Sequence, residues 1–195
     1  QFPSDFLNYE LFQSLETKTK AIKMRAGVKY NFSPFRFGFS MAIPYNINVE
    51  ENHGTQERLI FDNSDYSDAI QLGYYDYKIL IPATLDFGAA LVTESNLTLA
   101  MAFRIQDWSQ MEFNLMDFAS SSDEYATLKN ENDLIAEEYK SVTQLRFGGE
   151  YLLPITNTFG CVVRFGLVYI PTAKTSGSED RATTSLGIGI PIYDR

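Results

Sequence analysis

The chain has 195 residues, which is enough for one domain with a full hydrophobic core. Its formal net charge of -9 argues against nucleic-acid binding, which requires a basic surface, and its single cysteine excludes an internal disulfide. Aromatic residues make up 14% of the chain, and no run of about 18 apolar residues predicts a transmembrane helix.

Residues 5–16 carry apolar side chains at a rough three- to four-residue spacing, which predicts a short helix. From residue 22 onward, apolar and polar residues alternate with the period of two that is typical of strands. The alternation predicts seven strands, over residues 22–32, 35–50, 75–91, 97–106, 144–151, 159–169 and 185–192.

The alternation over residues 35–50 is the longest, because every odd position in it is apolar. Strands in soluble domains usually end after about 5–6 residues, whereas a strand that crosses a membrane needs about 9–11. We therefore expect residues 35–50 to cross a membrane and to continue outward as barrel wall above it. Pro44 predicts an irregularity in this wall, because proline has no N–H to donate to a central ladder.

The connections between the predicted strands alternate in length. Turn residues at Ser33-Pro34, Glu94–Asn96 and Pro154–Asn157 predict short connections. The long connections cover residues 51–72, 114–141 and 171–182, and residues 123–140 predict a helix in the second of them. This sorting is typical of an outer-membrane barrel, in which periplasmic turns are short and external loops are long. We assign residues 1–19 to an external loop or helix and residues 20–195 to the barrel strands and their loops.

Charged residues on the strands favour the inferred inward rows, which are mainly basic, while the long loops are acidic. The charges that we predict to line the lumen are Arg25, Arg36, Lys78, Arg104, Arg146, Glu150 and Arg164. One interpretation is that the lumen attracts anions, such as a carboxylate head group. The other, which we favour, is that these charges pair with each other or with a plug, since barrel interiors are routinely polar.

The sequence offers no catalytic, cofactor-binding or metal-binding constellation, so we do not expect an enzyme. The one histidine, His53, lies in a predicted polar loop, which leaves no histidine for a Ser/His/Asp triad elsewhere. Cys161 lies on an apolar row, where a thiol is a small hydrophobic group rather than a nucleophile.

Three segments together resemble the FadL-type outer-membrane transporters for long-chain fatty acids and other hydrophobic compounds. The segments are YYDYKILIPATLDFGAALVTESNLTLAMAFRIQDWSQMEF (74–113), QLRFGGEYLLPITNTFGCVVRFGLVYIP (144–171) and TSLGIGIP (184–191). In the second, Arg146, Gly148, Glu150 and Tyr151 are similar to the first half of a family hairpin. Its second half is matched by Arg164, Gly166, Tyr169 and Pro171.

The resemblance implies a fourteen-stranded barrel with an N-terminal hatch and a lateral opening through which the substrate leaves. The chain has about half the length that this implies, and it shows no hatch segment, so we expect it to form only part of such a barrel. The implied surroundings are outer-membrane lipids of a Gram-negative bacterium, further barrel strands or a partner chain, and a hydrophobic small molecule with or without an anionic head group. No ligand-contacting residue is transferred from the family.

Two other interpretations stay open. One is a complete outer-membrane barrel of about eight strands with a structural or narrow-channel role. The other is a soluble lipocalin-like barrel that binds an apolar ligand, with the apolar rows facing inward.

Overall fold

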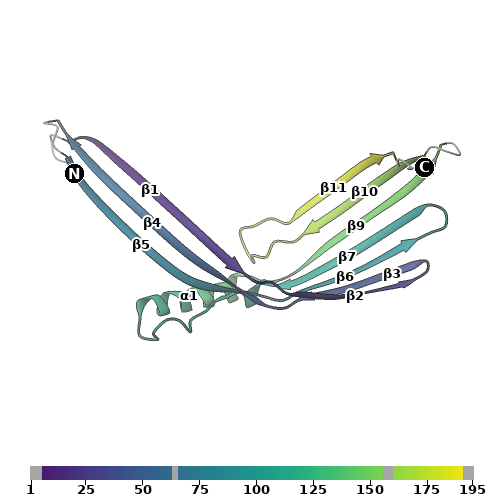
Figure 1. Ribbon diagram of the computed structural model, residues 1–195, viewed down its shortest axis with the longest axis horizontal. Coiled ribbons are helices and arrows are strands. Elements are labelled where there is room, and N and C mark those ends of the chain that lie inside the picture. The colour runs from purple at the N-terminus through teal and green to yellow at the C-terminus, as the bar shows by residue number, and fades with distance from the viewer. Residues whose placement is uncertain (1–5, 63–65, 156–159, 191–195) are drawn as a thin grey trace. The chain divides into compact units, whose positions relative to one another are not determined.

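A computed structural model describes residues 6–62, 66–155 and 160–190 of the chain (Figure 1). The chain divides into two compact units. Gln1–Ile22 and Asn46–Ile79 form the first unit, and Lys23–Tyr45 and Leu80–Arg195 form the second. Most of the described residues lie in antiparallel strands, which confirms the all-β prediction.

The second unit is built on a seven-stranded sheet whose spatial order follows the chain (Figure 1). All six pairings between neighbouring strands are antiparallel. In this order the strands are β2 (Arg25–Phe32), β3 (Phe35–Ala42), β6 (Thr84–Val92), β7 (Leu97–Asp107), β9 (Ser141–Pro154), β10 (Gly160–Ile170) and β11 (Arg181–Gly189). Each predicted strand therefore contributes to this sheet, although residues 191–192 of the last one lie outside the described residues.

Within the described residues the sheet is open, because β2 and β11 form its two edges and do not pair with each other. We expected the chain to supply part of a barrel, and the described residues do not close one by themselves.

The first unit contains β1 (Phe6–Ala21), β4 (Tyr45–Phe61) and β5 (Tyr66–Ile81), side by side in the order β1-β4-β5. The helix predicted over residues 5–16 is wrong, since β1 pairs antiparallel with β4 along nearly its whole length. The loop predicted over residues 51–72 is also wrong, because β4 and β5 occupy most of it. Alternation did not reveal the strands over residues 51–72, because polar and apolar residues are mixed at both the odd and the even positions of this segment.

Two of the predicted alternations are interrupted by proline. The alternation over residues 35–50 breaks at Ile43-Pro44, between β3 and β4, and that over residues 75–91 breaks at Pro82-Ala83, between β5 and β6. Because proline has no N–H to donate to the ladder, each strand ends one or two residues before its proline. The irregularity predicted at Pro44 is confirmed. At the second break the Gln106 side-chain amide donates to the Pro82 carbonyl at 3.3 Å.

The connections of the second unit differ between the two ends of its sheet. At one end, short turns at Ser33-Pro34 and residues 93–96 join neighbouring strands; the third turn lies partly in residues 156–159, outside the described residues. At the other end, β7 leads through a short helix, η1 (Trp108–Gln110), and β8 (Glu112–Phe113) into α1 (Asp123–Glu138). The helix predicted over residues 123–140 is confirmed.

Helix α1 begins at the N-cap Ser122, whose hydroxyl accepts a hydrogen bond from the Tyr125 amide at 3.1 Å. The Asn132 side chain accepts from the Phe113 amide at 2.7 Å and donates to the Phe113 carbonyl at 2.9 Å. Residues 171–180 connect β10 to β11, and the Thr175 amide donates to the Glu138 carbonyl at 2.7 Å at the end of α1. The long connections of this unit are therefore ordered by specific hydrogen bonds.

Candidate functional site

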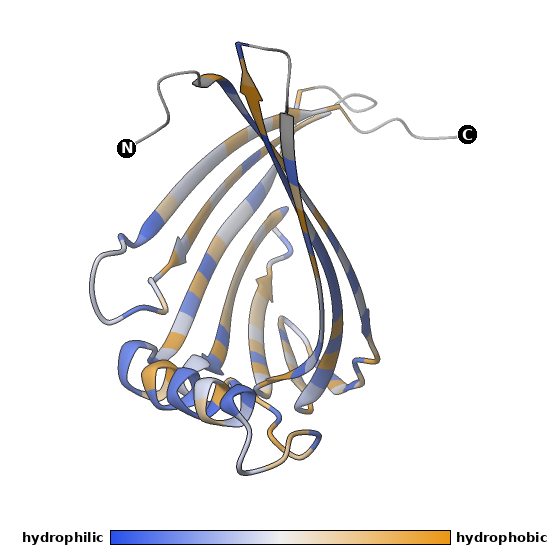
Figure 2. Ribbon diagram, turned by 90° about the vertical axis from the view of Figure 1, so that its left-hand side faces the viewer, coloured by the Kyte–Doolittle hydropathy of each residue, from blue (hydrophilic) through white to orange (hydrophobic). Residues whose placement is uncertain are grey.

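Bands of high and low hydropathy alternate along strands of the ribbon (Figure 2). Because successive side chains of a strand point to opposite sides, the seven-stranded sheet has two chemically distinct faces. We call one the apolar face; it includes Gly149 and the apolar residues Ala26, Val28, Tyr30, Phe32, Phe35, Phe37, Phe39, Met41, Leu85, Phe87, Ala89, Leu91, Leu97, Leu99, Met101, Phe103, Ile105, Leu145, Phe147, Tyr151, Leu153, Cys161, Val163, Phe165, Leu167, Tyr169, Leu186 and Ile188. We call the opposite surface the charged face.

Among the residues that the structure describes, Asp107 is the one charged residue of these strands on the apolar face, and it occupies the last position of β7. Large side chains on this face are exposed: Val28 is 66% exposed, Phe87 42% and Leu186 89%. Soluble monomers rarely expose contiguous apolar patches of more than a few hundred Å². A face of seven strands with this composition is therefore unusual for a soluble monomer.

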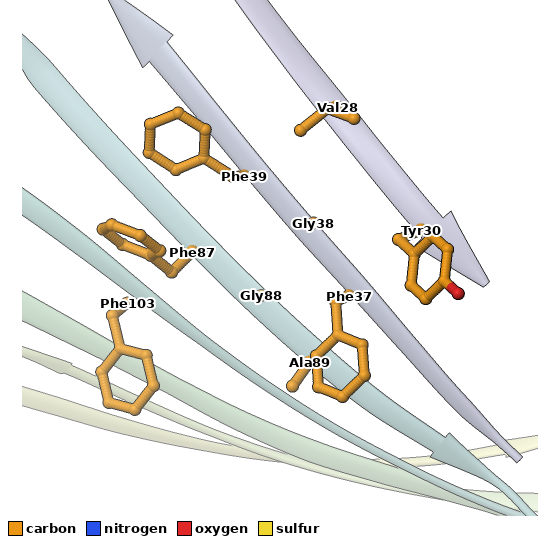
Figure 3. A pocket seen from close by; sticks show the side chains of 9 residues that line it. All are labelled: Val28, Tyr30, Phe37, Gly38, Phe39, Phe87, Gly88, Ala89 and Phe103. Atoms are coloured by element: carbon orange, nitrogen blue, oxygen red, sulfur yellow. The ribbon is translucent and has the colours of Figure 1, made fainter. Parts of the chain in front are cut away.

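A groove of about 360 Å³ lies on the apolar face across β2, β3, β6 and β7 (Figure 3). Its walls include the rings of Phe39 and Phe87, whose centroids are 5.0 Å apart, and the ring of Phe103. The small side chain of Ala89 lines both this groove and a neighbouring one of about 180 Å³ that Met101 also lines. The apolar face is thus grooved and aromatic rather than smooth.

The charged face carries an ion-pair cluster centred on Asp86 of β6. Arg104 Nε of β7 donates to Asp86 at 2.7 Å, Arg25 of β2 lies 3.1 Å away, and the Ser40 hydroxyl of β3 donates at 3.3 Å. Asp86 stands directly opposite both Ser40 and Arg104 in the register. The cluster therefore links four neighbouring strands through one carboxylate.

A second ion pair joins β9 to β10 on the same face. Arg164 Nε lies 2.6 Å from the Glu150 carboxylate, directly across the ladder. The Arg146 guanidinium, on the same strand as Glu150, donates to the Gln144 side chain at 3.4 Å. Arg36 lies on this face as well, near the β2–β3 turn and directly opposite Asn31.

Six of the seven predicted lumen-lining charges thus share one face of one sheet. They are Arg25, Arg36, Arg104, Arg146, Glu150 and Arg164. Lys78 is the exception, because it lies on β5 in the first unit. The pairing of Asp86 with Arg104 and of Glu150 with Arg164 agrees with our interpretation of mutually paired charges. The sequence does not identify Ser40 as a partner of these charges, because a serine on a polar row carries no distinguishing signal.

Much of the charged face between these ion pairs is built from small residues. Gly38, Gly88 and Ala102 are consecutive cross-strand partners on β3, β6 and β7. Beside them run Ala90, Ala100, Gly148 and Gly166 on β6, β7, β9 and β10. Bulky side chains therefore gather on the apolar face and small ones on the charged face.

In the connection from β10 to β11, Asp180 accepts hydrogen bonds from the Tyr169 hydroxyl and, at 2.8 Å, from the Thr172 amide. These bonds, above all that from Tyr169, hold the pKa of Asp180 below its ordinary value.

The residues considered for chemistry lie apart from one another. His53 lies on β4 rather than in a loop, and its ring stacks on Tyr75 with 5.5 Å between centroids. Cys161 is a free thiol, and its position in β10 places it on the apolar face. No group of three or more His, Cys, Asp or Glu that could hold a metal occurs among the described side chains. Over the same residues, no helix combines the length and the apolar character needed to cross a membrane.

Comparison with known proteins gave no match to any protein-family model, to any curated protein or to any solved structure.

Proposed function

We propose that this chain forms part of the wall of an outer-membrane β-barrel that carries hydrophobic small molecules, such as long-chain fatty acids, as FadL-type transporters do. In this proposal the apolar face of the seven-stranded sheet contacts lipid and the charged face lines the lumen. The single observation that carries it is the apolar face: seven neighbouring strands expose aromatic and aliphatic side chains, and the described charged residues of these strands, apart from Asp107, lie on the other side.

The distribution of side-chain volume supports the orientation. Side chains on the inner surface of a closed sheet converge, whereas those on the outer surface diverge. The small cross-strand partners Gly38, Gly88 and Ala102 suit the inner surface, and the rings of Phe39, Phe87 and Phe103 suit the outer one. A lipocalin-like barrel would require the reverse, with the rings filling the interior.

Strand direction bears on how the barrel closes. Six antiparallel pairings separate β2 from β11, so these two edge strands run in the same direction. Closure with antiparallel pairing throughout therefore requires an odd number of further strands between them. One such strand gives eight and seven give fourteen, both even totals of the kind found in bacterial barrels. Two copies of the sheet inserted in the same orientation would meet at parallel seams.

The composition of the first unit suits surroundings outside the hydrocarbon layer. Both faces of its sheet carry charges: in β1, Glu10 and Lys18 share one face with the 58% exposed ring of Phe12, while Glu51 and Glu57 of β4 lie on the other face. Strands of this composition suit water on both sides, whereas lipid would leave those charges without solvation.

Fractionation of the native protein tests the proposal. We expect the protein to sediment with outer membranes and to enter solution only with detergent. In a Gram-negative host that lacks its own fatty-acid importer, expression of the native protein should restore uptake of radiolabelled oleate. Recovery of the protein in the aqueous fraction without detergent would overturn the membrane assignment, and membrane localisation without uptake would overturn the transport assignment.

A further inference from the structure

On the β2–β3 hairpin, the charged face carries two cations that its ion pairs do not use. Arg25 and Arg104 share Asp86, and Arg164 pairs with Glu150. Lys29 of β2 and Arg36 of β3 have no carboxylate within ion-pair distance among the described residues. In a chain with a net charge of -9, two cations without an acidic partner on one hairpin need an explanation.

Both cations line the same pocket, which has a volume of about 420 Å³ and lies at the short-turn end of the β2–β3 hairpin. Asn31 stands directly opposite Arg36, and Lys29 precedes Asn31 by two residues on the same face. The rest of the wall includes Pro34 and Val92, whose backbones are joined by a hydrogen bond of 2.8 Å from the Val92 amide to the Pro34 carbonyl. Residues of the β2–β3 hairpin and of β6 thus line the pocket, so three strands contribute to it.

The chemistry of the pocket is that of an amphipathic anion. An arginine guanidinium can donate two parallel hydrogen bonds to one carboxylate, and a lysine adds a compact positive charge. The Asn31 amide supplies a further donor. Beside these polar groups, Pro34 and Val92 offer an apolar wall that an alkyl chain can contact. Because both cations line one pocket, a single anion held in it can interact with both of them.

We propose that this pocket binds the carboxylate head group of a hydrophobic molecule in the lumen, with Arg36 and Lys29 as the anion-binding residues. The site lies at the end of the sheet where the turns are short, away from the end that carries α1 and the 171–180 connection. The inference rests on the proposed function, because it assigns the charged face to a lumen that hydrophobic molecules enter.

Binding of three probes to the purified native protein in detergent tests the proposal. Radiolabelled oleate carries both the carboxylate and the chain, methyl oleate lacks the charge, and acetate lacks the chain. The variants are Lys29→Gln, Arg36→Gln and the two combined. Arg146→Gln is the matched control, because it removes one positive charge from the same face outside the pocket. The heat-dependent gel mobility of each variant verifies that it is folded, and the single variants serve if the double variant fails this check.

We expect oleate to bind at least tenfold more tightly than methyl oleate and acetate. Arg36→Gln should weaken oleate binding roughly tenfold or more, the size of a lost charge-assisted hydrogen bond, and leave methyl oleate unaffected. Arg146→Gln should bind oleate like the wild type. Equal oleate affinity in wild type, Arg36→Gln and the double variant would overturn the site, as would acetate binding as tight as that of oleate. Absence of binding of both oleate and methyl oleate to the wild type would instead contradict the proposed function itself.

Discussion

Arg104 and Asp86 face each other directly across β6 and β7, with 2.7 Å between Nε and the carboxylate. Their side chains are 30% and 21% exposed, whereas those of Arg164 and Glu150 are 58% and 45% exposed. Asp86 also receives Arg25 and Ser40, so removing its charge leaves two guanidinium groups beside each other. The two ion pairs should therefore contribute unequally to stability.

We expect Asp86→Asn to lower the free energy of unfolding by about 1–2 kcal/mol, because it removes charge-assisted hydrogen bonds that are partly shielded from water. Glu150→Gln should cost less than about 1 kcal/mol, the usual range of an exposed pair. Urea unfolding followed by the fluorescence of Trp108, the single tryptophan of the sequence, measures both. Equal losses would show that shielding does not distinguish the pairs.

Met101 and Ala100 are neighbours on β7 that belong to opposite faces of the sheet. Met101→Arg should cost about 2–4 kcal/mol in a lipid bilayer, the range for arginine on the lipid face near the midplane. Ala100→Arg should be tolerated, because its cross-strand partners Ala90 and Gly148 leave room and the face is polar. Unfolding in vesicles compares the two. Greater damage from Ala100→Arg than from Met101→Arg would reverse the assignment of faces.

The seven strands of the sheet could be predicted because one face excludes charge, so that Phe35, Phe37 and Phe39 repeat with period two. The same signal separated Arg104 from Phe103 and placed six of the candidate charges on one face. It failed for β1, where Leu11 and Leu15 lie on one face and Phe12 on the other. There the strand depends on pairing with β4, far along the chain, and such long-range pairing leaves no periodic trace.

The ion-pair partners were also beyond prediction, because they depend on register. Arg104 meets Asp86 only because β6 and β7 pair with Phe87 opposite Phe103. A shift of the register by two residues would preserve both faces and break the pair. The pocket at Lys29 and Arg36 depends in the same way on the β2–β3 register, which the Ser33-Pro34 turn sets.

Gly149 lies beneath the ring of Phe165 on the apolar face. A Cβ at this position would lie 2.4 Å from the Phe165 ring and 2.9 Å from Leu99. Gly149→Ala should displace the ring and cost roughly 1–2 kcal/mol of stability. At Gly88 the nearest atom to a Cβ is the Met101 carbonyl oxygen, at 3.7 Å, so Gly88→Ala should be neutral or stabilise by about 0.5 kcal/mol. The two glycine variants form a matched pair in urea unfolding, and similar losses would contradict the role of the ring.

The lowered pKa of Asp180 gives the 171–180 connection a pH dependence. Since the folded-state pKa is depressed, the two hydrogen bonds contribute fully above the ordinary carboxyl pKa and are lost as the pH falls through the lowered value. The chemical shift of the Thr172 amide proton should titrate with an apparent pKa below the usual aspartate range. In Asp180→Asn this titration should vanish. A midpoint at or above the ordinary value would contradict the assignment.

The Asn132 side chain holds α1 to Phe113 by two hydrogen bonds to one backbone unit. Asn132→Ala should speed hydrogen exchange of the Phe113 amide, because the amide loses the acceptor at 2.7 Å. Asn130, on the same helix, has no hydrogen bond of its side chain among those described and provides the control variant Asn130→Ala. If both variants left the exchange rate of the Phe113 amide unchanged, the Asn132 side chain would not protect this amide.

The orientation of the sheet is tested most directly by spin labels along β7. Single cysteines at residues 99–103, in a Cys161→Ser background, would carry the label in protein reconstituted into lipid vesicles. At Leu99, Met101 and Phe103 we predict high accessibility to molecular oxygen and low accessibility to a polar nickel complex. At Ala100 and Ala102 we predict the opposite. Accessibility without a period of two, or with the two sets exchanged, would contradict a lipid-facing apolar surface.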